Sequence, residues 1–239
     1  MGYGWRASLA EKAANFASHG YIVVASDPSD TAATLFPDGT YLTQSYPGPT
    51  PAVFQDRLRD PTFILDELTR WNTDDAVFAG RLDLAKVAAM GTCCGYPVTA
   101  EFSRNDPRCK AAILVACVAD RWPCLGSAAP VPELDQFGLG KPLLVIYGEN
   151  YANYTWLFDK SAKDAVAFQI RGTQELGSAM ILVSDFYWFL YPNYLATGRE
   201  ASRTIAAYSL WFLDKYLKGS SDPAPPLADY PRVLGFKQK

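Results

Sequence analysis

The sequence is poor in histidine, since only one of its 239 residues, His19, is of this type. Zinc, haem and catalytic sites that need two histidines are therefore excluded, and a site that needs one would have to use His19. His19 follows an Ala-rich stretch, Leu9–Ser18, with the apolar spacing of a helix, and Gly20 is a typical helix terminator. We interpret His19 as a structural residue at a helix end, and we expect no metal and no other cofactor.

Long apolar runs and runs of basic residues are also missing. No segment approaches the ~18–20 apolar residues of a membrane-spanning helix, and the first six residues lack the apolar core of a secretory signal. Lys and Arg number 22 against 25 Asp and Glu, which gives a formal net charge of −3. We therefore expect a cytoplasmic protein with no membrane span and no nucleic-acid partner.

Paired cysteines are missing as well. Five cysteines are present and none forms a CxxC pair, so at least one thiol is free, which favours a reducing compartment. We interpret four of the five as small, buried apolar side chains. These four are Cys94, Cys109, Cys117 and Cys124.

What the sequence does contain is an alternation of helix-like and strand-like segments. This alternation predicts an α/β fold with a mostly parallel sheet and helices on both faces, in one domain over residues 1–239. Short apolar runs predict strands at Tyr21–Ser26, Val87–Met90, Ala111–Val118, Leu143–Tyr147 and Val166–Ile170.

The helices and loops complete this expectation. Helical periodicity predicts helices over Leu9–Ser18, Phe54–Trp71, Val98–Arg104 and Ala201–Leu217. Pro61 is expected to break or kink the second of them near Asp60. Residues 27–51 are expected to form a long loop, and the tail from Ser220 is expected to be extended.

The most informative motif lies at a predicted strand-to-helix junction, Gly91-Thr92-Cys93-Cys94-Gly95. It matches the G-x-nucleophile-x-G elbow, with cysteine in place of the usual serine. The flanking glycines, Gly91 and Gly95, are expected to be required because side chains beside the nucleophile would collide with the backbone. The backbone N–H of Cys94 would form half of an oxyanion hole, and the helix N-terminus would favour a Cys93 thiolate. The alternative is an ordinary turn between strand and helix with buried cysteines.

Other segments surround this motif in a recognisable order. Together they resemble the platelet-activating-factor acetylhydrolase-like branch of the α/β-hydrolases over nearly the whole chain. The segments are Ala17–Ala25, Phe36–Gly39, Gly80–Val87, Asp106–Ala111 and Trp211–Gly219.

The resemblance implies roles for particular residues. Cys93 stands at the nucleophile position. Gly2-Tyr3-Gly4 matches the loop that completes the family's oxyanion hole, which implies the amide of Tyr3. The family's acid position corresponds to Ala116, with Asp120 slightly further on, and a second acid position falls near Glu149.

The family's histidine position is occupied by Glu175, so the ordinary Ser–His–Asp relay is missing at all three positions. Glu175 could handle the proton if burial raised its pKa towards neutrality. The alternative is that Glu175 is a solvated loop residue. His19 matches a family histidine that has no catalytic role.

The resemblance also bears on assembly. In the family, the oxyanion loop follows three strands, whereas here it begins at residue 2, so N-terminal strands of the family's sheet are missing. One of them lies beside the nucleophile strand. Two explanations are open: the sequence is a partial product, or another subunit replaces the missing strand. An unpaired strand edge is an association site, and we therefore expect a homodimer.

Three functions remain open. The first is a Cys93-centred enzyme acting on a small hydrophobic ester, thioester or lactone, in keeping with the aromatic stretch Phe186–Tyr191, which also fits core or lid packing. The second is a non-hydrolytic cyclase or isomerase that uses the same pocket and lacks the base that activates water. The third is a catalytically inactive ligand-binding or scaffold protein.

Overall fold

The computed structural model of the chain describes eight stretches of sequence. They are residues 10–27, 34–43, 51–92, 95–115, 138–149, 156–161, 164–173 and 195–239.

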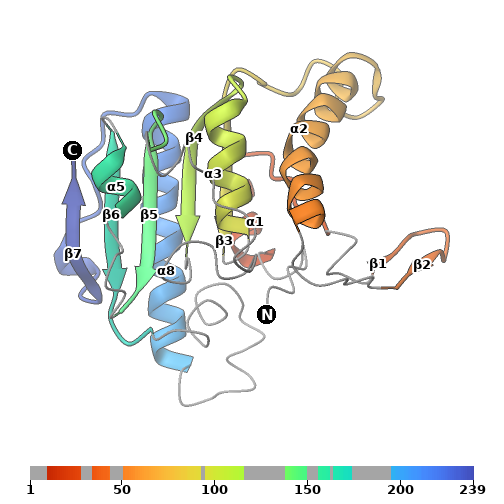
Figure 1. The fold of residues 1–239 in the computed structure, drawn as a ribbon. Coiled ribbons are helices and arrows are strands. Elements are labelled where there is room, and N and C mark those ends of the chain that lie inside the picture. The colour runs from red at the N-terminus through yellow and green to blue at the C-terminus, as the bar shows by residue number, and fades with distance from the viewer. Residues whose placement is uncertain are drawn as a thin grey trace.

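A five-stranded sheet forms the centre of the described structure (Figure 1). Its order is β3-β4-β5-β6-β7, and the first four strands are parallel, whereas β7 pairs antiparallel with β6. The strands are β3 (Val87–Thr92), β4 (Cys109–Val115), β5 (Leu143–Gly148), β6 (Ala165–Ile170) and β7 (Val233–Gln238). The predicted mostly parallel α/β sheet is therefore confirmed, with four of its five predicted strands in place.

Helices cover both faces of the sheet, because successive strand residues point to opposite sides. In β4, Ile113 and Val115 pack with α1 and α8, whereas Ala112 and Leu114 pack with α3 and α5. The helices are α1 (Ala10–Ser18), α2 (Pro51–Asp74), α3 (Gly95–Asn105), α5 (Trp156–Lys160) and α8 (Leu195–Leu213). No helix within the described ranges is both long enough and apolar enough to cross a bilayer.

The helix α2 runs through Pro61 without interruption, so the expected break is wrong. A proline removes one backbone hydrogen bond, but packing on both sides of it can keep the helix together. Here Leu65, one turn after Pro61, is buried against Phe102 of α3 and Cys109 of β4. This tertiary contact outweighs the local cost of the proline.

The expected strand Tyr21–Ser26 is also wrong. These residues have no secondary structure, and the side chains of residues 22–26 are exposed. In the described part of the chain no hydrogen bond joins Ile22, Val23 or Val24 to β3, the nearest edge of the sheet. An apolar run becomes a buried strand only where a neighbouring strand pairs with it, and none of the strands that the structure describes does so here.

Three parts of the structure were not predicted, and the first is the short helix α5. A small hairpin of β1 (Thr34–Leu35) and β2 (Tyr41–Leu42) lies within the expected loop, and Gly39 in its turn has a φ of +87°. The tail expected to be merely extended contains a short helical turn, η5 (Leu227–Asp229), and then β7. Phe236 of β7 packs on Phe168 with ring centroids 6.2 Å apart.

Helix α8 runs antiparallel to the parallel strands, which defines the two ends of the molecule. A Cβ on Gly172, just after β6, would lie 3.1 Å from Thr197 Cγ2 in the first turn of α8. At its far end α8 continues into a π-helical segment, η4 (Asp214–Lys218), where the Tyr216 hydroxyl donates to Asp164 just before β6 (3.2 Å). The carboxyl ends of the strands therefore share one edge with the start of α8 (Figure 1).

Candidate functional site

The connection from β3 to α3 leaves no room for a side chain at Gly91. β3 ends at Thr92 and α3 begins at Gly95, while Cys93 and Cys94 lie outside the described residues. A Cβ atom on Gly91 would overlap Thr99 Oγ1 and the carbonyl oxygen of Gly95, and would lie 2.8 Å from the Gly95 carbonyl carbon. Any residue other than glycine would therefore push the strand and helix apart.

Gly95 differs from Gly91 in this respect. Among the described residues, a Cβ atom on Gly95 would meet no atom within 4 Å. The structure therefore shows the expected close contact at Gly91, and the requirement for Gly95 stays a prediction.

Glu149 follows β5 and is tied to the turn after β6. Its backbone N–H donates to the Thr173 carbonyl (2.7 Å), and its Oε2 accepts from the Gly172 N–H (2.7 Å). Gly172 has a φ of +80°, and the buried Thr173 hydroxyl donates to the Ile170 carbonyl (2.5 Å). The carboxylate of Glu149 is thus directed towards β6. Because β4 separates β5 from β3, the ends of β5 and β3 are about 10 Å apart, and this hydrogen bond leads away from the β3–α3 turn.

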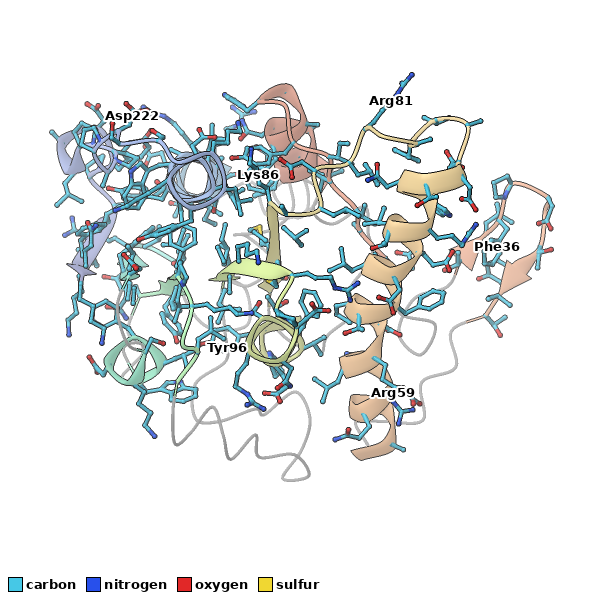
Figure 2. The ribbon with its side chains drawn as sticks, turned by 90° about the horizontal axis from the view of Figure 1, so that it is seen from above. Phe36, Arg59, Arg81, Lys86, Tyr96 and Asp222 are labelled. Carbon is cyan, nitrogen blue, oxygen red and sulfur yellow. The ribbon has the colours of Figure 1, made fainter. Side chains whose placement is uncertain are left out.

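Two tyrosine hydroxyls meet beneath the same edge of the sheet. Tyr96, in the first turn of α3, and Tyr147, near the end of β5, are both buried, and their hydroxyl oxygens lie 3.1 Å apart. Figure 2 shows Tyr96 with α3 on the side of the sheet opposite α8. We did not predict this pair from the sequence. The only signals were the adjacency of Tyr96 to the Gly91–Gly95 motif and the place of Tyr147 at a strand end.

His19 lies at the other end of the molecule. Its Nδ1 is 2.8 Å from the Asn15 carbonyl oxygen in the last turn of α1, and its own carbonyl accepts from Lys218 Nζ (2.9 Å). Lys218 belongs to η4, beside the amino ends of the strands. The interpretation of His19 as a residue at a helix end is confirmed. His19 lies near the amino ends of the parallel strands, whereas the β3–α3 turn lies at their carboxyl ends.

The buried thiol of Cys109 agrees with its expected structural role. Its Sγ donates to Ser103 Oγ (3.3 Å), and burial raises the pKa of the thiol. No group of three or more metal-ligating side chains occurs within the described stretches.

The remaining predicted site residues lie outside the described residues. They are Tyr3, Cys93, Cys94, Asp120 and Glu175, together with the aromatic stretch 186–191. Of the predicted set, the structure therefore places Gly91 and Gly95 at the β3–α3 turn and Glu149 after β5.

No protein-family model matches the chain, and no curated protein sequence matches it. The likeness to the α/β-hydrolases stays a prediction from the sequence motifs.

Proposed function

We propose that the chain is an enzyme of the α/β-hydrolase type that transfers an acyl group from a small hydrophobic ester, thioester or lactone to Cys93. The observation that carries the proposal is the close approach at Gly91. A strand and helix packed this tightly, at the carboxyl edge of four parallel strands, match the requirements of a nucleophile elbow. Cys93 occupies the nucleophile position of that motif.

The chemistry follows from the residues of the motif. The Cys93 thiolate attacks the substrate carbonyl carbon, and the carbonyl electron pair becomes an oxyanion that accepts hydrogen bonds from the amides of Tyr3 and Cys94. Collapse of this intermediate expels the alcohol or thiol, which takes up a proton, and leaves an acyl-cysteine. The position two residues before α3 favours the thiolate, because a helix N-terminus attracts negative charge.

The place of His19 favours a second candidate, a non-hydrolytic cyclase or isomerase. With the sole histidine at the opposite end of the sheet, no imidazole can activate water against the acyl-cysteine. A nucleophile carried within the substrate would then compete well with water and close a ring. Glu175, at the family's histidine position, is the proton-handling group in either case, with Glu149 and Asp120 as the alternatives.

Intact-protein mass spectrometry tests the covalent step. We expect brief exposure to p-nitrophenyl butyrate to add one butyryl group to the protein, and Cys93→Ala to abolish the addition. The matched control is Cys109→Ala, which removes a buried thiol and should leave the addition unchanged. Butyrylation that persists in Cys93→Ala would show that Cys93 is not the nucleophile. No addition to any variant would favour a non-catalytic, ligand-binding function.

A second pair of variants separates the two glutamates. Glu175→Gln should slow butyrylation and flatten its pH dependence, because it removes the proposed proton acceptor. Glu149→Gln keeps an oxygen that can accept from the Gly172 N–H, and should leave the pH profile unchanged. The opposite result would assign proton handling to Glu149.

A further inference from the structure

Exposed apolar side chains gather in one part of the chain. Ten large apolar residues are exposed within the described stretches, and nine of them lie between residues 22 and 77. We call this set of residues the β3 flank. It draws on the run after Tyr21, the β1–β2 hairpin, α2 and the turn after α2, and its members are Ile22, Val23, Val24, Leu35, Phe36, Tyr41, Leu42, Phe63 and Val77. Only Leu227, near the C-terminus, stands apart from it.

Within the described part of the chain, no strand pairs with the edge of β3 that faces away from β4. β3 hydrogen-bonds to β4 alone within the described residues, and five of its six residues are partly exposed. An edge strand presents unpaired N–H and C=O groups that a further strand can satisfy. None of the residues from Val87 to Thr92 is charged or proline, so this edge has none of the usual protection against pairing.

The apolar run Ile22-Val23-Val24 follows Tyr21, whose side chain is held by two contacts with η4. The Tyr21 hydroxyl donates to Asp214 Oδ1 (2.7 Å), and Lys218 Nζ lies 4.1 Å from the centre of the Tyr21 ring. Tyr21 packs against the same core cluster as Ala88 and Met90 of β3. From there the segment passes between β3 and α2 (Figure 2). The run and the strand edge therefore form a prepared surface on which a further strand can pack.

The β1–β2 hairpin has the composition of such an insert. Leu35 and Tyr41 are directly opposite each other and share one face, so Phe36 and Leu42 lie on the other. All four are exposed, and Figure 2 shows Phe36 beyond α2, away from the sheet. A strand pair with apolar residues on both faces is typical of structure buried on both faces. The four side chains are nevertheless 42% to 64% exposed.

We propose that a second copy of the chain covers the β3 flank, with the β1–β2 hairpin of each copy inserted beside β3 of the other. Each copy carries both the insert and the open edge, so one reciprocal exchange buries both kinds of surface and closes with two-fold symmetry.

The exposed area favours this occupant. Three of the nine side chains are aromatic and six are aliphatic. At roughly 100 Å² for a half-exposed aromatic side chain and roughly 50 Å² for a half-exposed aliphatic one, the nine together offer on the order of 600 Å². A standard interface takes about 800 Å² from each partner, of which a little over half is apolar. The exposed apolar area of the flank is therefore sufficient for one side of such an interface.

Sedimentation velocity across protein concentrations tests the proposal. We expect a dimer, and at least a tenfold rise in its dissociation constant on Tyr41→Glu in the insert or Val23→Lys beside the edge. Leu227→Glu is the matched control, because it changes an equally exposed apolar residue outside the flank and should leave the dimer intact. A monomer of the unaltered chain at 50 µM would overturn the proposal, as would equal weakening by Leu227→Glu.

Mixing the two variants tests reciprocity. A Tyr41→Glu copy keeps its unaltered β3 edge, and a Val23→Lys copy keeps its unaltered hairpin. In a mixed dimer, the unaltered hairpin of one copy can therefore insert beside the unaltered edge of the other. We expect the mixture to associate more tightly than either variant alone. No gain on mixing would rule out the exchange.

Hydrogen exchange separates a second copy from the hairpin of the same molecule. In the dimer, the outward amides of Val87–Thr92 should be protected at 50 µM and lose that protection on dilution. Protection that is independent of concentration would assign the edge to a segment of the same chain and would overturn the proposal.

Discussion

Two apolar triplets of nearly the same composition have opposite surroundings in this molecule. Leu144-Val145-Ile146 of β5 is completely buried, whereas Ile22-Val23-Val24 is between 40% and 56% exposed. β5 is hydrogen-bonded on both sides and covered by helices on both faces, while the second triplet has no strand beside it in the described structure. The comparison teaches that such a sequence indicates a capacity for burial, and that its neighbours decide whether burial occurs.

The boundary between these two regions is β3, and Gly91→Ala should disturb it most. The added Cβ would overlap backbone at Gly95, so we expect a loss of more than about 4 kcal/mol in the free energy of unfolding, or failure to fold. Gly95→Ala is the control, and should change stability by less than about 1 kcal/mol. Urea denaturation measures both. Equal losses would contradict the packing described at Gly91.

A phenylalanine from each region sharpens the comparison. Phe168 is completely buried among Tyr208 and Phe236, and Phe168→Ala should cost about 3–4 kcal/mol through lost contacts and a cavity. Phe63 on α2 is 63% exposed, and Phe63→Ala should cost less than about 0.5 kcal/mol at concentrations where the chain is monomeric. Urea unfolding of dilute protein measures both. A large loss in Phe63→Ala under these conditions would mean that the β3 flank is covered within one molecule.

An ionic contact joins α2 to the turn between α3 and β4, and it predicts a pH dependence of stability. Hydrogen bonds from the Arg108 guanidinium lower the pKa of Asp106, and Arg108 Nη1 also reaches Asp66 of α2 (2.7 Å). A lowered folded-state pKa stabilises the protein above the unfolded value of about 3.9, and that contribution is lost as the pH falls through the folded value.

The variant that tests this contact is Asp106→Asn. It should cost about 2 kcal/mol at pH 7, with a difference from the unaltered chain that shrinks as the pH falls below about 4. Urea unfolding at several pH values measures this difference. A difference that stays constant down to pH 2.5 would show that the ionised carboxylate is not responsible.

The last prediction concerns the carboxyl edge of the buried region, where the expected loss is smaller than for Asp106→Asn. Glu149→Ala leaves the Gly172 N–H without its acceptor and should cost about 1 kcal/mol. Glu149→Gln keeps an acceptor oxygen, so thermal unfolding should show most of that loss restored. Equal losses in the two variants would mean that the charge of the carboxylate matters more than the hydrogen bond.

Much of the fold could be predicted from local sequence because local and tertiary preferences agree there. The strand Leu143–Gly148 is an uninterrupted apolar run, and α1 ends before Gly20, whose φ is +86°. The errors arose where a distant contact decided the outcome. The packing of Leu65 keeps α2 intact beyond Pro61, and the run after Tyr21 lacks the neighbouring strand that its composition anticipates.

The candidate site was predictable only as far as its motif reaches. Gly91 could be found from its spacing to Cys93, because the tight turn is a local property. The partners of Glu149 and the Tyr96–Tyr147 pair were not predictable, since they join residues 23 and 51 positions apart. Such pairs depend on the order of strands in the sheet, which local patterns do not encode.

The opposite margin of the sheet, β7, would limit how far molecules paired as proposed could join edge to edge. Gly235 of β7 has a φ of +58°, the pairing with β6 shifts register between Ala167 and Gln169, and Lys237 places a charge on the strand. Irregular backbone and lysine both discourage a further strand. A filament that grows by strand pairing requires two sheet edges on every molecule that can each accept a further strand. Because β7 disfavours such pairing, it would stop this growth. Deleting β7 would expose the hydrogen-bonding edge of β6, and the shortened molecule would then have two edges able to pair with further strands.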